Sequence, residues 1–182
     1  MEEEHDPFDR LLEGNRRFAS GADPKMLKEL CKGQKPYAAV VYCSDSRVPV
    51  EMIFGADEPG SLFGIRVAGN VAVDPSVLGS IEYAVAHLHV PLLVILGHTD
   101  CGAIKGAMKG GEHGHIASLL SHLEPACGEG RGDVRKAAEA NVRNQIRGLS
   151  EASPVVRAAR EAGKLAIVGA IYDLETGRVT RI

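Results

Sequence analysis

Two short motifs in the sequence bring together residue types that can bind a metal ion. Cys43 opens the motif Cys-Ser-Asp-Ser-Arg, and the motif Gly-His-Thr-Asp-Cys-Gly contains His98 and Cys101. Two thiolates and one imidazole suit a tetrahedral zinc site with a free fourth position, which is the catalytic type of zinc site. The motifs are too far apart for a zinc finger. A cysteine at a strand end is also often a small buried apolar residue, so spacing alone leaves both interpretations open.

The first motif also contains a charged pair, Asp45 and Arg47. Both residues flank the expected end of a buried strand, where burial of an unpaired charge is costly, so we expect them to pair with each other. One interpretation is a structural ion pair at the strand end. The other is a carboxylate that a guanidinium holds within reach of the metal, where it accepts a hydrogen bond from a bound water.

Each motif directly follows a short apolar run that is typical of a strand. Residues 36–42 precede the first motif, residues 92–96 precede the second, and residues 61–67 form a further run after Pro-Gly. These runs predict strands that are buried on both faces. In open α/β sheets, ligands bind at the carboxyl ends of the strands, so two neighbouring strands can present both motifs to one crevice.

The segments between and after these runs predict helices. Residues 75–90 have apolar side chains at helical spacing after Asp74, a favourable N-cap residue that proline follows. Residues 134–149 and 155–162 are also helical in pattern, and an apolar strand follows at 165–172. The tail predicts a hairpin turn into an antiparallel edge strand. This order predicts an α/β fold with a central, mostly parallel sheet flanked by helices.

Two further segments have weaker patterns. Residues 7–18 carry an apolar face within an N-terminal helical arm over residues 1–30, and this face packs either on its own domain or on a second subunit. The segment 108–133 is rich in glycine and histidine, and it predicts a loop with a short helical stretch at 116–123.

Composition limits the class of protein. A length of 182 residues corresponds to a single domain, residues 1–182. The net charge of -3 provides no field that would attract nucleic acid. Four cysteines are too few for a disulfide scaffold, the acidic N-terminus does not resemble a signal peptide, and the longest apolar run is too short to span a membrane. We therefore expect a cytoplasmic protein without nucleic-acid or membrane partners.

From about residue 11 to residue 177, the sequence resembles the β-class carbonic anhydrases. The resemblance depends on the two motifs described above and on Arg-Val-Ala-Gly-Asn at residues 66–70, which lies between them. Residues 81–88 are similar to the plant-type branch of that family. The resemblance implies reversible hydration of carbon dioxide to bicarbonate and a proton.

The resemblance also implies roles for individual residues. Cys43, His98 and Cys101 match the ligands of one Zn²⁺ per subunit, and Asp45 with Arg47 matches a catalytic dyad that orients zinc-bound hydroxide. His87 matches a proton-transfer histidine, and it lies four residues after Tyr83, on the same face of the predicted helix. The positions that match the substrate pocket are Gln34, Phe63, Ala68, Tyr83 and Gly102. Members of the family form homodimers and dimer-based oligomers such as homotetramers, with the site at the subunit interface.

The sequence departs from the family pattern at three points. Val67 stands where many members have asparagine, and Ala68 stands where plant-type members have valine, so we expect a slightly wider pocket. Some members have a tryptophan-containing bicarbonate site that inhibits the enzyme, and this sequence has no tryptophan. We therefore do not expect that form of regulation.

Three functions stay open at this point. The first is hydration of carbon dioxide. The second is hydrolysis of carbonyl sulfide or carbon disulfide at the same zinc. The third is a non-enzymatic zinc protein, either structural or redox-sensing. A further open question is whether Asp45 binds the zinc directly at rest and so closes the fourth position.

Overall fold

The computed structural model describes residues 6–182, and the chain divides into two compact units, Met1–Gln34 and Lys35–Ile182. The described part of the first unit consists of the helices α1 (Pro7–Gly21) and α2 (Pro24–Leu30). Each helix follows an aspartate N-cap whose carboxylate accepts a backbone N–H bond, and proline occupies the first turn. The predicted helical arm is thus helical over most of its length.

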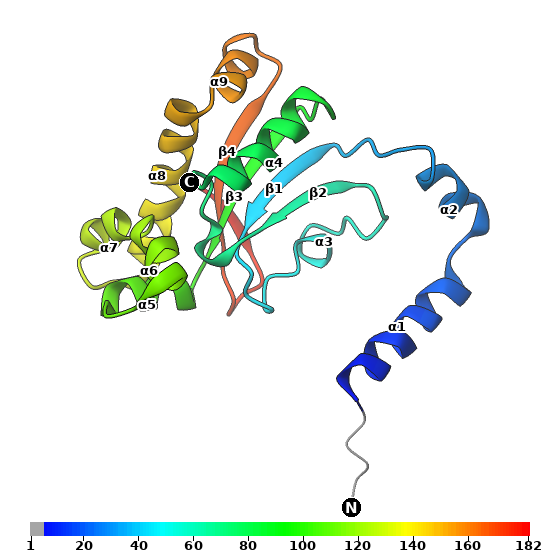
Figure 1. The fold of residues 1–182 in the computed structure, drawn as a ribbon, viewed down its shortest axis with the longest axis horizontal. Helices are drawn as coiled ribbons and strands as arrows, with labels where there is room; N and C mark the ends of the chain where they lie inside the picture. Colours follow the sequence, from blue (N-terminus) through cyan, green and yellow to red (C-terminus); the bar gives the residue numbers. More distant parts are fainter. Residues whose placement is uncertain (1–5) are drawn as a thin grey trace, which may run out of the picture. The chain divides into compact units, whose positions relative to one another are not determined.

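The second unit contains one five-stranded sheet with the strand order β2-β1-β3-β4-β5 (Figure 1). The first four strands in this order are parallel, and β5 pairs with β4 in the antiparallel sense. The bounds are β1 Ala38–Tyr42, β2 Leu62–Arg66, β3 Leu92–His98, β4 Ala166–Tyr172 and β5 Val179–Arg181. The predicted α/β fold, with its mostly parallel sheet and antiparallel edge strand, is confirmed.

Apolar side chains on both faces of the central strands explain why the sheet is buried. Along β1, Ala39 and Val41 pack into one apolar cluster, whereas Val40 and Tyr42 pack into another on the opposite face. The prediction that β2 is also buried on both faces is wrong. Strand β2 lies at the edge of the sheet, and its Gly64 and Arg66 are exposed.

Three helices pack around one face of the sheet. They are α4 (Pro75–Ala86), α8 (Val134–Ala152) and α9 (Pro154–Glu161), and all three match predicted helices within a few residues. The Asp74 carboxylate accepts the Ser76 N–H bond at 3.0 Å, which confirms the expected N-cap. The short elements α3 (Val50–Ile53) and η1 (Ala68–Asn70) lie between strands. Within residues 6–182, no helix combines the length and apolar character that crossing a membrane requires.

The segment after β3 differs from its prediction. The predicted helical stretch at 116–123 corresponds to α6 (Gly114–Ser121). The loop predicted around it is wrong, because α5 (Gly102–Lys109) extends into the segment and α7 (Glu124–Gly130) follows α6. Gly110, Gly111 and Gly114 all have positive φ, so these glycines separate the helices instead of preventing them. The three helices contribute Ile104, Leu120 and other side chains to an apolar cluster that includes the two buried cysteines.

Candidate metal centre

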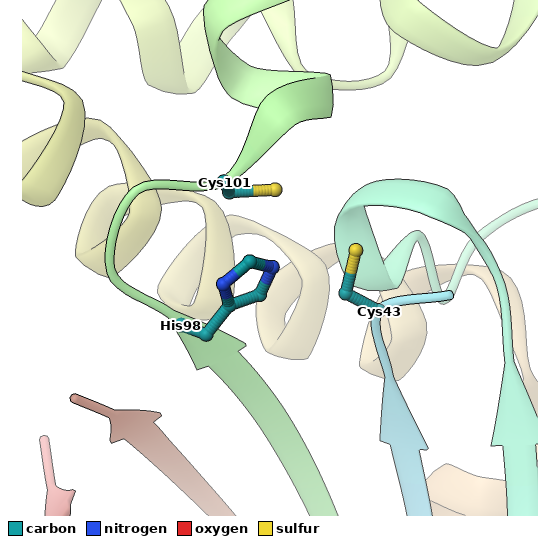
Figure 2. A group of neighbouring side chains, drawn as sticks. All are labelled: Cys43, His98 and Cys101. Carbon is teal, nitrogen blue, oxygen red and sulfur yellow. The ribbon is translucent and has the colours of Figure 1, made fainter. Parts of the chain in front are cut away.

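The two sequence motifs meet at the carboxyl edge of the sheet. Cys43 directly follows β1, His98 is the last residue of β3, and Cys101 caps the start of α5. Strands β1 and β3 are neighbours in the sheet. The two Sγ atoms and a ring nitrogen of His98 therefore lie within 4.8 Å of one another, and all three residues are buried (Figure 2). The expected proximity of the motifs is confirmed.

The donor set is suited to a metal ion. The His98 Nδ1 lies 2.8 Å from the Thr99 carbonyl oxygen, an acceptor to which this nitrogen can donate its proton. That bond leaves the lone pair on Nε2, which is buried and has no hydrogen-bond partner among the described residues. A buried nitrogen without a partner is costly, and a bound cation removes that cost. One imidazole and two thiolates are ligands that zinc binds well.

The contact between the two cysteines shifts the pKa values of their thiols in opposite directions. The Cys101 thiol donates to Cys43, and this hydrogen bond is the main reason that the pKa of Cys43 is lowered. The same contact raises the pKa of Cys101, and burial raises it further. The backbone N–H of Gly69 also donates to the Cys43 Sγ at 3.3 Å. Of the two cysteines, Cys43 is therefore the one that more readily forms the thiolate, which is the form that binds metals.

Asp45 and Arg47 form the expected ion pair beside this cluster. The guanidinium donates from Nε to Asp45 Oδ1 at 2.9 Å and from Nη2 to Oδ2 at 2.7 Å. These bonds hold the pKa of the Asp45 carboxyl well below its usual range. Asp45 Oδ2 lies 3.9 Å from His98 Nε2, and the Arg47 guanidinium also contacts Asp100, which pairs with Lys105. An ionised carboxylate thus lies next to the nitrogen that lacks a partner.

A cavity of about 500 Å³ includes two of the predicted pocket residues, Ala68 and Gly102. Its other walls are mostly apolar, and Ile116 and Leu119 of α6 contribute to them together with His115. The helical spacing of Ile116, Leu119 and Leu120 predicts the stretch 116–123, which overlaps α6, but it does not indicate that this helix lines the pocket.

The structure brings three other predicted residues together at a different place. The rings of Phe63 and Tyr83 lie 6.2 Å apart, and those of Tyr83 and His87 lie 5.1 Å apart. Phe63 pairs with Ala39, four residues before Cys43, which is roughly 13 Å along the strand. We call Phe63, Tyr83 and His87 the aromatic strip. It lies toward the amino end of the strands, away from the metal cluster of its own chain.

The remaining predicted pocket residue, Gln34, is the last residue of the first unit and is exposed. Its role in the pocket stays a prediction. The other two cysteines, Cys31 and Cys127, lie outside the metal cluster and form no disulfide.

Comparisons with known proteins agree on one family. The family described as "Carbonic anhydrase" matches residues 38–179 of this chain. Carbonic anhydrase 2 of Mycobacterium tuberculosis is 37% identical, over 92% of this chain and 87% of the relative. The carbonic anhydrase of Mycolicibacterium smegmatis is also 37% identical, over 93% and 88%.

Solved structures give the same result. A tetrameric β-carbonic anhydrase from Sordaria macrospora superposes with a TM-score of 0.87 at 29% identity, covering 96% of each chain. A β-carbonic anhydrase from Aspergillus fumigatus superposes with a TM-score of 0.86 at 32% identity, covering 97% of this chain and 91% of that one.

Proposed function

Since this chain belongs to the β-class carbonic anhydrase family, we propose that it binds one zinc ion per subunit and hydrates carbon dioxide reversibly. The proposed ligands are Cys43, His98 and Cys101. The observation that carries the proposal is the buried His98 Nε2, which has no hydrogen-bond partner among the described residues and lies beside two buried sulfur atoms. A cytoplasmic, reducing setting is part of the proposal, because Cys43 and Cys101 can bind zinc only when they are not oxidised.

The charged pair has a defined role in this proposal. When bound, zinc would act as a Lewis acid that lowers the pKa of water and so supplies hydroxide as the nucleophile at about neutral pH. The ionised Asp45 can only accept a hydrogen bond, so it orients the attacking water with a lone pair toward the substrate. Arg47 keeps this carboxylate ionised and fixes its plane through two hydrogen bonds.

The apolar cavity suits a small uncharged substrate. Ala68 and Gly102 form part of its wall, and Gly102 is next to the ligand Cys101 in sequence. Carbon dioxide carries no net charge, so its entry needs no electrostatic attraction, in agreement with the net charge of -3. We assign this cavity to the substrate.

A second copy of the chain completes the proposed site. The aromatic strip lies too far from the metal cluster of its own chain to contact the same substrate, so it serves the cluster of a partner subunit. His87 is then the proton relay and Gln34 a substrate-binding residue of this shared site. The protein is a homodimer or a dimer-based oligomer, as the tetrameric relatives from Sordaria macrospora also suggest.

Hydrolysis of carbonyl sulfide or carbon disulfide is a second candidate. The observation in its favour is Ala68, whose small side chain lines the cavity where plant-type members have valine. A purely structural or redox-sensing zinc protein is disfavoured, because it does not need an ionised carboxylate beside an open coordination position.

Stopped-flow measurement of carbon dioxide hydration tests the proposal, with sulfide release from carbonyl sulfide and carbon disulfide measured in parallel. The protein must have a known zinc content, and the pH should range from 7 to about 9, which includes the range where zinc would supply hydroxide. We expect hydration to be the faster reaction. If fully zinc-loaded protein does not hydrate carbon dioxide in this range, the proposal is wrong, and sulfide release then selects the second candidate.

A further inference from the structure

A buried polar network lies behind the proposed metal site. Its side chains are Asn141 and Gln145 of α8, which are only 1% and 2% exposed. Burying an amide group is costly unless it forms hydrogen bonds, so the bonds of these two side chains determine how they lie. The partners in those bonds belong to the segment 69–72, which follows β2.

The two amides connect to both ends of the segment 69–72. Asn141 Nδ2 donates to the Gly69 carbonyl oxygen at 2.9 Å. Gln145 Oε1 accepts the backbone N–H bond of Ala72 at 2.8 Å. Gln145 Nε2 also donates to Asn141 Oδ1 at 3.0 Å, so each amide fixes the orientation of the other.

The network holds Gly69, and Gly69 in turn contacts Cys43, a proposed metal ligand. Its φ of 68° lies in the left-handed region, and a Cβ atom there would lie 2.7 Å from Leu123 Cδ1. Its backbone N–H donates to the Cys43 Sγ. Packing and the α8 amides together therefore determine where this N–H group points.

We propose that Asn141 and Gln145 are positioning residues, which hold Gly69 so that its N–H group stabilises the Cys43 thiolate and tunes the metal. This inference rests on the proposed zinc site. A hydrogen bond to a ligating sulfur draws electron density away from the metal and makes it a stronger Lewis acid. Two thiolate ligands donate much negative charge, so this bond offsets part of their effect.

Cobalt substitution of the full-length protein tests the inference. Co²⁺ reports sulfur bonding through its thiolate-to-metal charge-transfer absorption, which moves to longer wavelength when a sulfur loses a hydrogen bond. We expect this shift in Asn141→Leu, which removes the donor but keeps much of the side-chain volume, and a smaller shift in Gln145→Met. Zinc affinity should fall by about 10- to 100-fold in Asn141→Leu, as is usual for the loss of a residue that supports a ligand.

Two substitutions on the same helix serve as controls. Asn144→Leu makes the same change at a residue that bonds to Glu129 instead of Gly69. Val142→Ala removes core packing at a fully buried position and leaves the amide network intact. Both variants should keep the wild-type absorption band. A band that does not move in Asn141→Leu, or that moves as far in Val142→Ala, would overturn the inference.

Wild-type protein loaded with ¹¹³Cd gives a test that does not depend on the folding of a variant. The Gly69 amide proton should show a scalar coupling to the metal across its bond to Cys43, and lack of that coupling would refute the inference. The two proposals fail differently. Wild-type protein without any thiolate-to-metal band contradicts the metal site itself, whereas a wild-type band that the α8 variants leave unchanged contradicts only the positioning role.

Discussion

At the residue scale, the candidate site separates two kinds of side chain. Cys43, His98 and Cys101 are buried, whereas the Asp45 and Arg47 side chains are 16% and 49% exposed. The buried residues offer one ligand atom each, and Asp45 forms two hydrogen bonds to Arg47. Metal retention should therefore depend on the first group and turnover on the second.

This separation predicts different losses for two substitutions. Cys101→Ala should lose zinc, because it removes one of three ligands. Asp45→Ala should retain zinc and lose about 100-fold or more in turnover, as expected for a group that orients the nucleophile. Metal analysis by mass spectrometry together with stopped-flow hydration distinguishes the two variants. Equal zinc loss in both would instead make Asp45 a required ligand.

At the scale of secondary-structure elements, the sequence predicted the strand ends well because their signals are local. An apolar run stops and a polar motif begins at Cys43, directly after β1, whereas β3 continues two residues beyond its predicted end and includes His98. Helix α6 matches the predicted stretch at 116–123, whereas α5 and α7 are not predicted, because glycine is also typical of loops and a glycine at positive φ can equally end one helix and precede the next. The exposed side chains of β2 depend on its edge position, which no local pattern encodes.

The position of the aromatic strip relative to the metal cluster also could not be predicted from the sequence. The spacing of Tyr83 and His87 predicts that they share one helix face, and the contact between their rings agrees with this prediction. Their distance from the metal cluster depends on the direction of α4 across the sheet, which is a tertiary property. The network of Asn141 and Gln145 was missed for the same reason, because each bonds to backbone groups more than 70 residues earlier in the chain.

Ser153, at the junction of α8 and α9, is predicted to stabilise the fold. Ser153 is fully buried, and its hydroxyl donates to Glu82 Oε1 at 2.6 Å. The Ser153 Oγ atom also accepts the Val156 N–H bond that caps α9. Ser153→Ala should lower the free energy of unfolding by about 1–2 kcal/mol, because it removes the cap and leaves the Glu82 carboxylate without this donor. Urea denaturation measures the change.

Ser150→Ala is the matched control for this prediction. The Ser150 hydroxyl bonds mainly to the Ile146 carbonyl within the same helix, so its loss should change the free energy of unfolding by less than about 0.5 kcal/mol. Equal effects of the two substitutions would show that Ser153 is not a stabilising cap.

At the scale of the whole molecule, the proposed shared site predicts complementation between two inactive variants. One variant carries Asp45→Ala, and the other carries Tyr83→Ala with His87→Ala. In a mixed dimer, the intact metal site of the second variant meets the intact aromatic strip of the first. Random exchange makes half of all dimers mixed, each with one complete site of two, so activity should return to about one quarter of the wild-type value.

The control for complementation is each variant mixed with itself, which should stay inactive. Sedimentation should show a dimer or a larger oligomer in every case. A monomeric protein, or mixed samples without regained hydration activity, would contradict the shared site and return the aromatic strip to a role within its own chain.

The order of the strands has a consequence that is independent of any side chain. Strands β1 and β3 are neighbours, but the chain continues from β1 to β2 on one side and from β3 to β4 on the other. This is a topological switch point, where the connections leaving two adjacent strands diverge and a crevice opens between them. The winding of the chain therefore sets the location of the site, and Cys43, His98 and Cys101 set only its chemistry. A variant without these ligands would keep the crevice, which makes this edge of the sheet a suitable place to build a different binding site.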